Sequence, residues 1–160
     1  MKKSIFYFVF LFAVSVIACN DAENEHKGHG KDNGPKTQAD SLKKTMDDDH
    51  LIGMSKMGRL TRAEQTARRL LDSISKLPAK ARQAAEPLKS KLDSLQKELS
   101  YAEIAMDKWM KELKKDSVIN SMEMAERIKY LSSEKLKAAK VKENILKGLQ
   151  NADSILKDKF

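Results

Sequence analysis

Residues 88 to 113 read LKSKLDSLQKELSYAEIAMDKWMKEL. In this stretch apolar side chains recur alternately four and three residues apart, at Leu88, Leu92, Leu95, Leu99, Ala102, Met106, Trp109 and Leu113. A repeat of about 3.5 residues places these side chains on one helix face, forming the heptad seam of a coiled coil. The stretch therefore predicts a long amphipathic helix that packs against other helices.

The segment before this helix carries a similar pattern. Residues 40 to 77 predict one helix, with Asp40 as its N-cap and Pro78 as its stop. Its apolar stripe consists of Met46, Met54, Met57, Leu60, Ala67, Leu71 and Ile74, with Leu70 and Leu77 beside it. Gly53 and Gly58 should each weaken the first half of this helix by about 1 kcal/mol, so we expect that half to be frayed or irregular.

Residues 116 to 156 predict a third helix, capped by Asp116 or Ser117. Its stripe runs through Val118, Met122, Ala125, Ile128, Leu131, Leu136, Ala139, Ile145, Leu149, Ala152 and Ile155 or Leu156. Pro87 either kinks the middle helix or marks its true start.

These segments and the composition of the chain predict an all-α fold. β-Branched residues are scarce, so strands are not favoured. The helices have matched lengths and short links at 76–79 and 114–117, which predicts that residues 40 to 160 form an antiparallel three-helix bundle. The alternative is a longer coiled coil that dimerises through part of the same seam.

The N-terminus has the pattern of a bacterial lipoprotein signal. Lys2 and Lys3 precede an apolar run that ends in Val-Ile-Ala-Cys at 16–19, and this run is short for a membrane span. We expect residues 1 to 18 to be cleaved and Cys19 to carry acyl chains, each buried methylene contributing about 0.8 kcal/mol to anchoring. An ordinary secretory signal or a single-span anchor is the alternative.

Residues 19 to 39 predict a flexible tether, because they contain few large apolar side chains. The acidic residues Asp21, Glu23 and Glu25 resemble signals that sort lipoproteins to the outer membrane of Gram-negative bacteria. They do not specify whether the protein would be on the periplasmic face or on the cell surface. This segment also contains His26 and His29. We expect a solvated linker here and not a metal site, because two imidazoles on a flexible segment do not form a closed site.

No pattern in the chain predicts catalysis. We find no Gly-rich phosphate loop, no Ser-His-Asp or Cys-His arrangement and no carboxylate pair in an apolar frame. The 31 basic residues are interspersed with 23 acidic ones, which favours a solvated surface. We therefore expect a protein that is not an enzyme, and no nucleic-acid partner for a chain outside the cytoplasm.

One constellation could carry chemistry. Met46, His50, Met54 and Met57 follow each other at steps of four, four and three residues, on one face of the first helix. Thioether and imidazole groups are ligands that suit copper(I). The favoured alternative is a methionine-rich surface that packs in the core or against a partner.

A second apolar cluster contains Met106, Trp109 and Met110 near the end of the middle helix. In an antiparallel bundle this end lies near the start of the first helix. Met54, Met57, Met106 and Trp109 are thus a candidate partner surface. Its occupant would be a second copy of the chain or an envelope protein docked near residues 46 to 60.

Several of these stretches are similar to a family of short helical lipoproteins of Gram-negative bacteria that are often labelled viral A-type inclusion protein. The similar residues are Met46 with His50, then MSKMG at 54–58, and YAEIAMDKWM at 101–110. In the family the histidine is often followed by an aspartate, where this chain has Leu51. The resemblance implies a lipid-anchored α-helical protein and supplies no activity.

We therefore expect a lipid-anchored envelope protein with a structural or protein-interaction role and no cofactor beyond its covalent lipid. The alternative is a copper-binding lipoprotein that uses the Met/His face.

Overall fold

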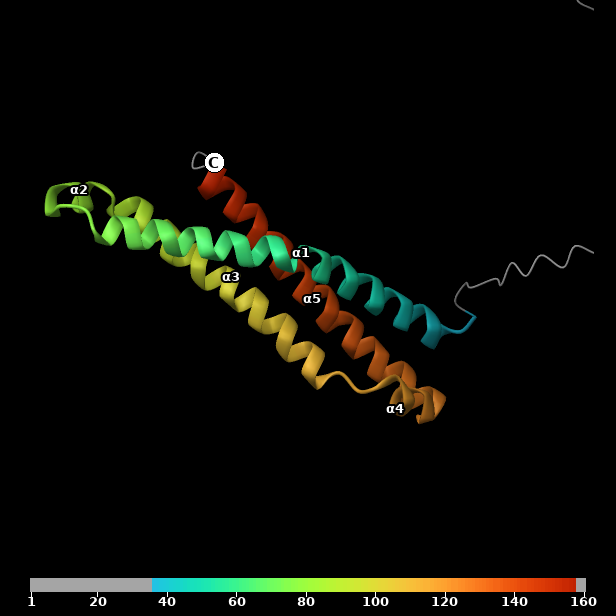
Figure 1. Cartoon of the computed structure of the whole chain (residues 1–160). Helices are drawn as coiled ribbons and strands as arrows, with labels where there is room; N and C mark the ends of the chain where they lie inside the picture. The colour runs from blue at the N-terminus through green and yellow to red at the C-terminus, as the bar shows by residue number, and fades with distance from the viewer. Residues whose placement is uncertain (1–35, 158–160) are drawn as a thin grey trace, which may run out of the picture. The chain divides into compact units, whose positions relative to one another are not determined.

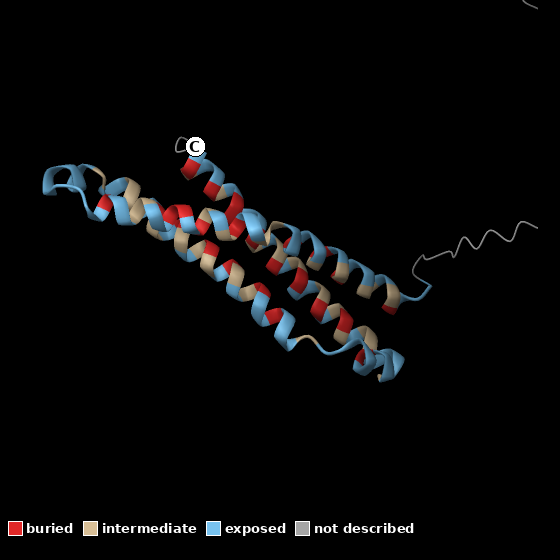
Figure 2. Cartoon of the chain, viewed as in Figure 1, coloured by how far each residue is buried: buried red, intermediate tan, exposed pale blue. Residues whose placement is uncertain are grey.

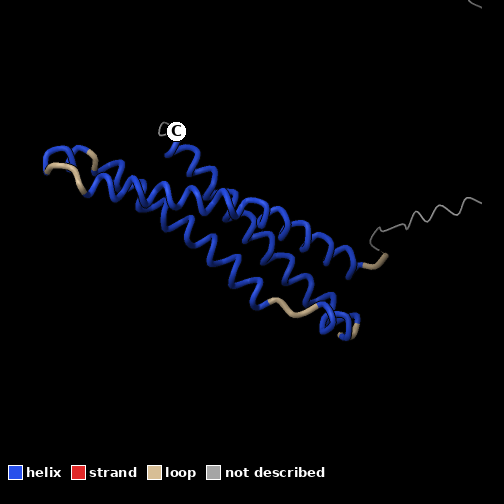
Figure 3. Tube along the Cα trace, viewed as in Figure 1, coloured by secondary structure: helices blue, strands red, loops and turns tan. Residues whose placement is uncertain are grey.

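The computed structural model describes residues 36 to 157, and within this range every regular element is helical (Figures 1 and 3). The helices are α1 (Gln38–Ser75), α2 (Ala79–Ala84), α3 (Glu86–Glu112), α4 (Asp116–Ser121) and α5 (Met124–Leu156). The all-α prediction is confirmed. Cys19, His26 and His29 lie outside the described residues.

The three long helices α1, α3 and α5 pack against one another. The short helices α2 and α4 lie at opposite ends of the bundle, where the chain reverses its direction (Figure 1). Successive long helices are therefore antiparallel, as predicted. Within the described residues, the buried apolar side chains form one core that extends from Ala39 to Leu156.

The heptad seam of α3 forms the middle of this core. Six of its side chains are buried, namely Leu92, Leu95, Leu99, Ala102, Met106 and Trp109. Leu88 and Leu113, at the two ends of the seam, are half-buried and pack against the others. Figure 2 shows that buried residues lie where the long helices face one another, whereas α2 is exposed.

The start of α1 differs from the prediction. Thr37, not Asp40, is the N-cap, and Asp40 occupies the N3 position of a capping box. The Thr37 hydroxyl accepts a hydrogen bond from the Asp40 backbone N–H, and the Asp40 carboxylate accepts one from the Thr37 N–H, both at 3.1 Å. This reciprocal pair satisfies two backbone donors, which a lone Asp40 cap would not do.

Pro87 marks the start of α3 and does not kink it. The proline stands in the first turn of α3, where its missing N–H costs no helical hydrogen bond. The residues before it form the separate helix α2, joined to α3 at Ala85.

The prediction of one continuous helix over residues 116 to 156 is wrong. This segment divides into α4 and α5 at Met122, whose ψ of 147° is extended. Lys115, not Asp116 or Ser117, is the N-cap of α4. The break allows α4 to place Ile119 fully inside the core at the end of the bundle.

The predicted apolar stripe of α5 is also partly wrong. Leu136 of α5 is 70% exposed and Val118 of α4 also lies on the surface, although the predicted stripe contains both. The buried face instead steps from Leu131 through Glu134, Ala138, Val141, Ile145, Gly148 and Leu149 to Ala152 and Leu156. The sequence pattern misses part of this seam because Glu134 and Gly148 occupy core positions, where an amphipathic helix usually has an apolar side chain.

Candidate functional site

The structure divides the four donors predicted on α1. Met46 is buried in the core, and Met57 is half-buried against it. Met54 is 41% exposed, and His50 lies between these extremes at the boundary of the core. The helix therefore positions the donors at different depths, from the core to solvent.

The donor that contacts His50 comes from α3. His50 Nε2 lies 3.3 Å from the sulfur of Met110, a residue outside the predicted ligand set. Both side chains reach solvent, since His50 is half-buried and Met110 is exposed. This contact joins an imidazole nitrogen and a thioether from two helices, and sequence spacing within one helix could not reveal it.

Trp109 completes the surroundings of His50 and belongs to the core. Its ring meets the imidazole edge-to-face, with centroids 5.3 Å apart and planes at 61°. Its indole N–H donates to Glu134 of α5 at 3.0 Å, and Glu134 also accepts from Lys137 at 2.8 Å. The indole is thus held from both sides, by α1 and by α5.

The predicted partner surface must be corrected. Met106 and Trp109 are almost fully buried, because they belong to the heptad seam of α3 and face α1 and α5. They cannot contact a partner while the bundle is folded. The apolar side chains that remain exposed on this part of α1 include Leu51, at 64%, and Met54.

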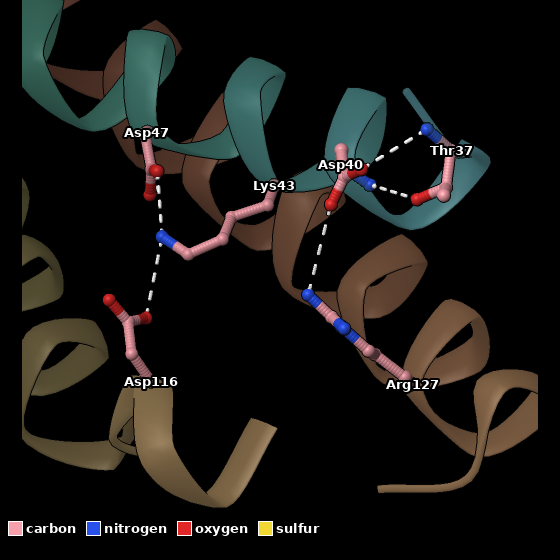
Figure 4. A network of polar contacts seen from close by, with 6 residues as sticks. All are labelled: Thr37, Asp40, Lys43, Asp47, Asp116 and Arg127. Carbon is pink, nitrogen blue, oxygen red and sulfur yellow. Dashed lines mark hydrogen bonds and ion pairs between the residues drawn. The ribbon is translucent and has the colours of Figure 1, made fainter. Parts of the chain in front are cut away.

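A polar network fixes the first turns of α1 against α4 and the first turn of α5 (Figure 4). The ammonium of Lys43 lies 2.8 Å from Asp47 of the same helix and 3.3 Å from Asp116 of α4. Arg127 of α5 lies 3.9 Å from Asp40. Burial lowers the pKa of Lys43, but its hydrogen bonds to the two aspartates and their charges outweigh this effect, so its pKa is raised.

A second ion pair crosses from α1 to α5. Asp49, the residue before His50, is buried and pairs with Lys142. Asp49 therefore faces α5 while His50 faces α3. Two adjacent positions, about 100° apart around α1, are thus in contact with different helices.

Between residues 36 and 157, no three histidine, cysteine or acidic side chains converge to hold a metal ion. The arrangement at His50 is instead a two-donor contact of soft character, an imidazole nitrogen and a thioether sulfur. Nothing in this part of the chain is long and apolar enough as a helix to cross a membrane.

Comparisons with protein-family models, with curated proteins and with solved structures find no match to this chain.

Proposed function

We propose that this chain is a lipid-anchored envelope protein whose bundle has a structural or protein-binding role and no catalytic one. The lipoprotein pattern ending in Cys19 supports the anchor. The tether between Cys19 and Thr37 would separate the bundle from the outer membrane.

The observation that best supports a binding role is the exposed apolar surface at the middle of α1. Leu51 and Met54 are exposed there, one residue and one helical turn after His50, and Met110 of α3, which contacts His50, is exposed as well. Methionine side chains adapt to differently shaped partners, and grouped exposed apolar residues are typical of interaction sites.

The test is cross-linking in intact cells, with a photoreactive residue at Met54. A cross-linked product of defined mass is expected, at twice the mass of the chain for a second copy and at another mass for an envelope partner. The matched control carries the photoreactive residue at Leu136, which is exposed on α5. A clean monomer by sedimentation together with no product from Met54, or equal products from both positions, would overturn the binding role.

A second candidate function is copper(I) binding, and the contact between His50 and Met110 is the observation that favours it. Copper(I) accepts low coordination numbers and soft ligands, and an imidazole nitrogen with a thioether provides two of them. Met54, one turn after His50 on the same helix, is a further donor within the predicted set.

Titration with copper(I) against a chromophoric chelator separates this function from the first. Submicromolar binding that is lost in both His50→Ala and Met110→Leu would establish it. Met124→Leu is the matched control, since Met124 is an exposed methionine at the start of α5. No binding, or equal binding by the Met110→Leu chain, would exclude this contact as a copper site.

A further inference from the structure

A groove of about 1120 Å³ lies between the second half of α1 and the last turns of α5. Figure 1 shows these last turns, coloured red, running away from α1. The volume slightly exceeds the range for small-molecule sites, which is about 300 to 1,000 Å³. The six residues named from the sequence as a metal or partner site do not line this groove; they are Met46, His50, Met54, Met57, Met106 and Trp109.

The floor of the groove is apolar. It is formed by Ala63 of α1 and by Leu149, Ala152 and Leu156 of α5. The three α5 residues follow the seam of the helix, so the apolar strip extends for about 10 Å along it. Because Ala63 and Ala152 have small side chains, the strip stays open between the two helices. Such a floor suits an alkyl chain laid along α5.

The rim of the groove is cationic. Arg59, Arg62 and Arg69 of α1 line it together with Lys157. Asp153 is the acidic residue that lines the groove, and it pairs with Arg59.

Two of the guanidinium groups in the rim have no carboxylate partner within residues 36 to 157. Arg69 donates a hydrogen bond to the neutral hydroxyl of Thr66 at 3.0 Å. Arg62 takes part in none of the ion pairs among residues 36 to 157, whereas the neighbouring Arg59 and Arg68 each pair with a carboxylate. The groove therefore has an excess of positive charge above an apolar floor.

We propose that this groove binds one molecule of an anionic amphiphile, an alkyl chain that ends in a phosphate. The chain lies along the floor, and the phosphate lies between Arg62 and Arg69. These two residues are about 10 Å apart along α1. The Arg62 guanidinium, which lies beside Gly58, would turn toward Arg69 to share one headgroup. A guanidinium group matches the oxygens of a phosphate in a two-pronged hydrogen bond.

Both halves of the ligand are needed for this fit. A bare anion would leave the floor in contact with water, and an uncharged chain would leave the arginines uncompensated. This proposal does not depend on the anchor or on the binding role of the α1 surface, because it rests on different residues.

Calorimetry with dodecyl phosphate, kept below its micellar concentration, tests the proposal. The protein is the chain from residue 19 onward with Cys19→Ser, which retains every residue of the core. We expect saturable binding of one molecule per chain. Arg62→Gln combined with Arg69→Gln should weaken it by at least about tenfold, because two charge-assisted hydrogen bonds are lost.

The matched control is Lys91→Gln combined with Lys147→Gln, which removes the same charge from exposed positions outside the groove. Its affinity should stay within about twofold of the parent, since salt screens distant charges. Circular dichroism confirms that each variant is folded.

Three results would overturn the proposal. Equal binding of dodecyl maltoside would show that the headgroup charge is irrelevant, and equal binding of inorganic phosphate would show that the chain is irrelevant. Unchanged affinity in the folded Arg62→Gln, Arg69→Gln chain would place the ligand elsewhere.

Discussion

Gly53 of α1 lies directly against the terminal methyl group of Met106 of α3. A Cβ atom at residue 53 would come within 2.5 Å of that methyl group and 3.4 Å of Cδ1 of Ile145 on α5. The glycine therefore sits where α1 meets both other long helices, and its missing side chain permits their close approach. The helix is continuous through this point, so the expected irregular first half is wrong.

Gly53→Ala and Gly58→Ala should have different effects on stability. Gly58 is exposed, with the Arg62 guanidinium at 3.6 Å from an added Cβ, so alanine there should stabilise the helix by about 1 kcal/mol. At Gly53 the same gain is opposed by overpacking, whose cost should lie near the lower end of about 1 to 3 kcal/mol because the obstructing atom is the flexible end of Met106. Urea unfolding of both variants measures the difference, and equal stabilisation would contradict the close approach.

Leu99→Asp should unfold the bundle or cost several kcal/mol, on the order of 3 to 5. Leu99 is fully buried, and it packs so closely on Gly148 of α5 that a Cβ atom added to this glycine would lie 3.2 Å from Cδ2 of Leu99. Leu136→Asp is the control, because Leu136 is mostly exposed. Thermal melts followed by circular dichroism compare the two, and a Leu99→Asp chain that melts like the parent would refute the seam.

The hydrogen bond from Trp109 to Glu134 should be measurable as a coupling energy. Trp109→Phe removes the N–H donor and leaves the buried Glu134 with Lys137 alone, at a cost of about 1 to 3 kcal/mol. In a Glu134→Leu background the same change should cost less, because no buried acceptor is left unpaired. Purely additive effects in this double-mutant cycle would mean that the bond contributes nothing to stability.

The network around Lys43 should add stability that disappears at alkaline pH. Since the folded-state pKa of Lys43 is raised above its ordinary value of 10.5, its contribution is complete below 10.5 and is lost as the pH rises through the folded-state pKa. Lys43→Gln should thus be less stable than the parent at neutral pH by roughly 0.2 to 1 kcal/mol, as for partly exposed ion pairs. Urea unfolding across pH 8 to 12 tests this expectation. A difference that grows with pH would contradict it.

Cys19 should be the modified first residue of the mature protein. Mass spectrometry of protein extracted from membranes is expected to find an acylated N-terminal peptide beginning at Cys19. Recovery of the intact Met1 peptide, or a Cys19→Ala chain that fractionates like the parent, would refute the anchor.

The helical class and the antiparallel arrangement could be predicted because local periodicity encodes them. The seam from Leu88 to Leu113 repeats without a break, and Pro78 marks a chain reversal. Periodicity failed where core positions hold residues that are usually exposed. Glu134 is buried because Trp109 and Lys137 satisfy its oxygens, a circumstance that no pattern within one helix contains.

The sequence by itself determined which residues share a helix face, and so brought the end of the middle helix near Met46 and His50. Only the tertiary structure decided that His50 meets Met110, that Gly53 admits Met106, and that four basic residues surround an apolar groove. A helical repeat fixes the direction in which each side chain projects around the axis of its own helix. The rotation and separation of neighbouring helices depend on side chains that are far apart in the chain, and these set the contacts between helices.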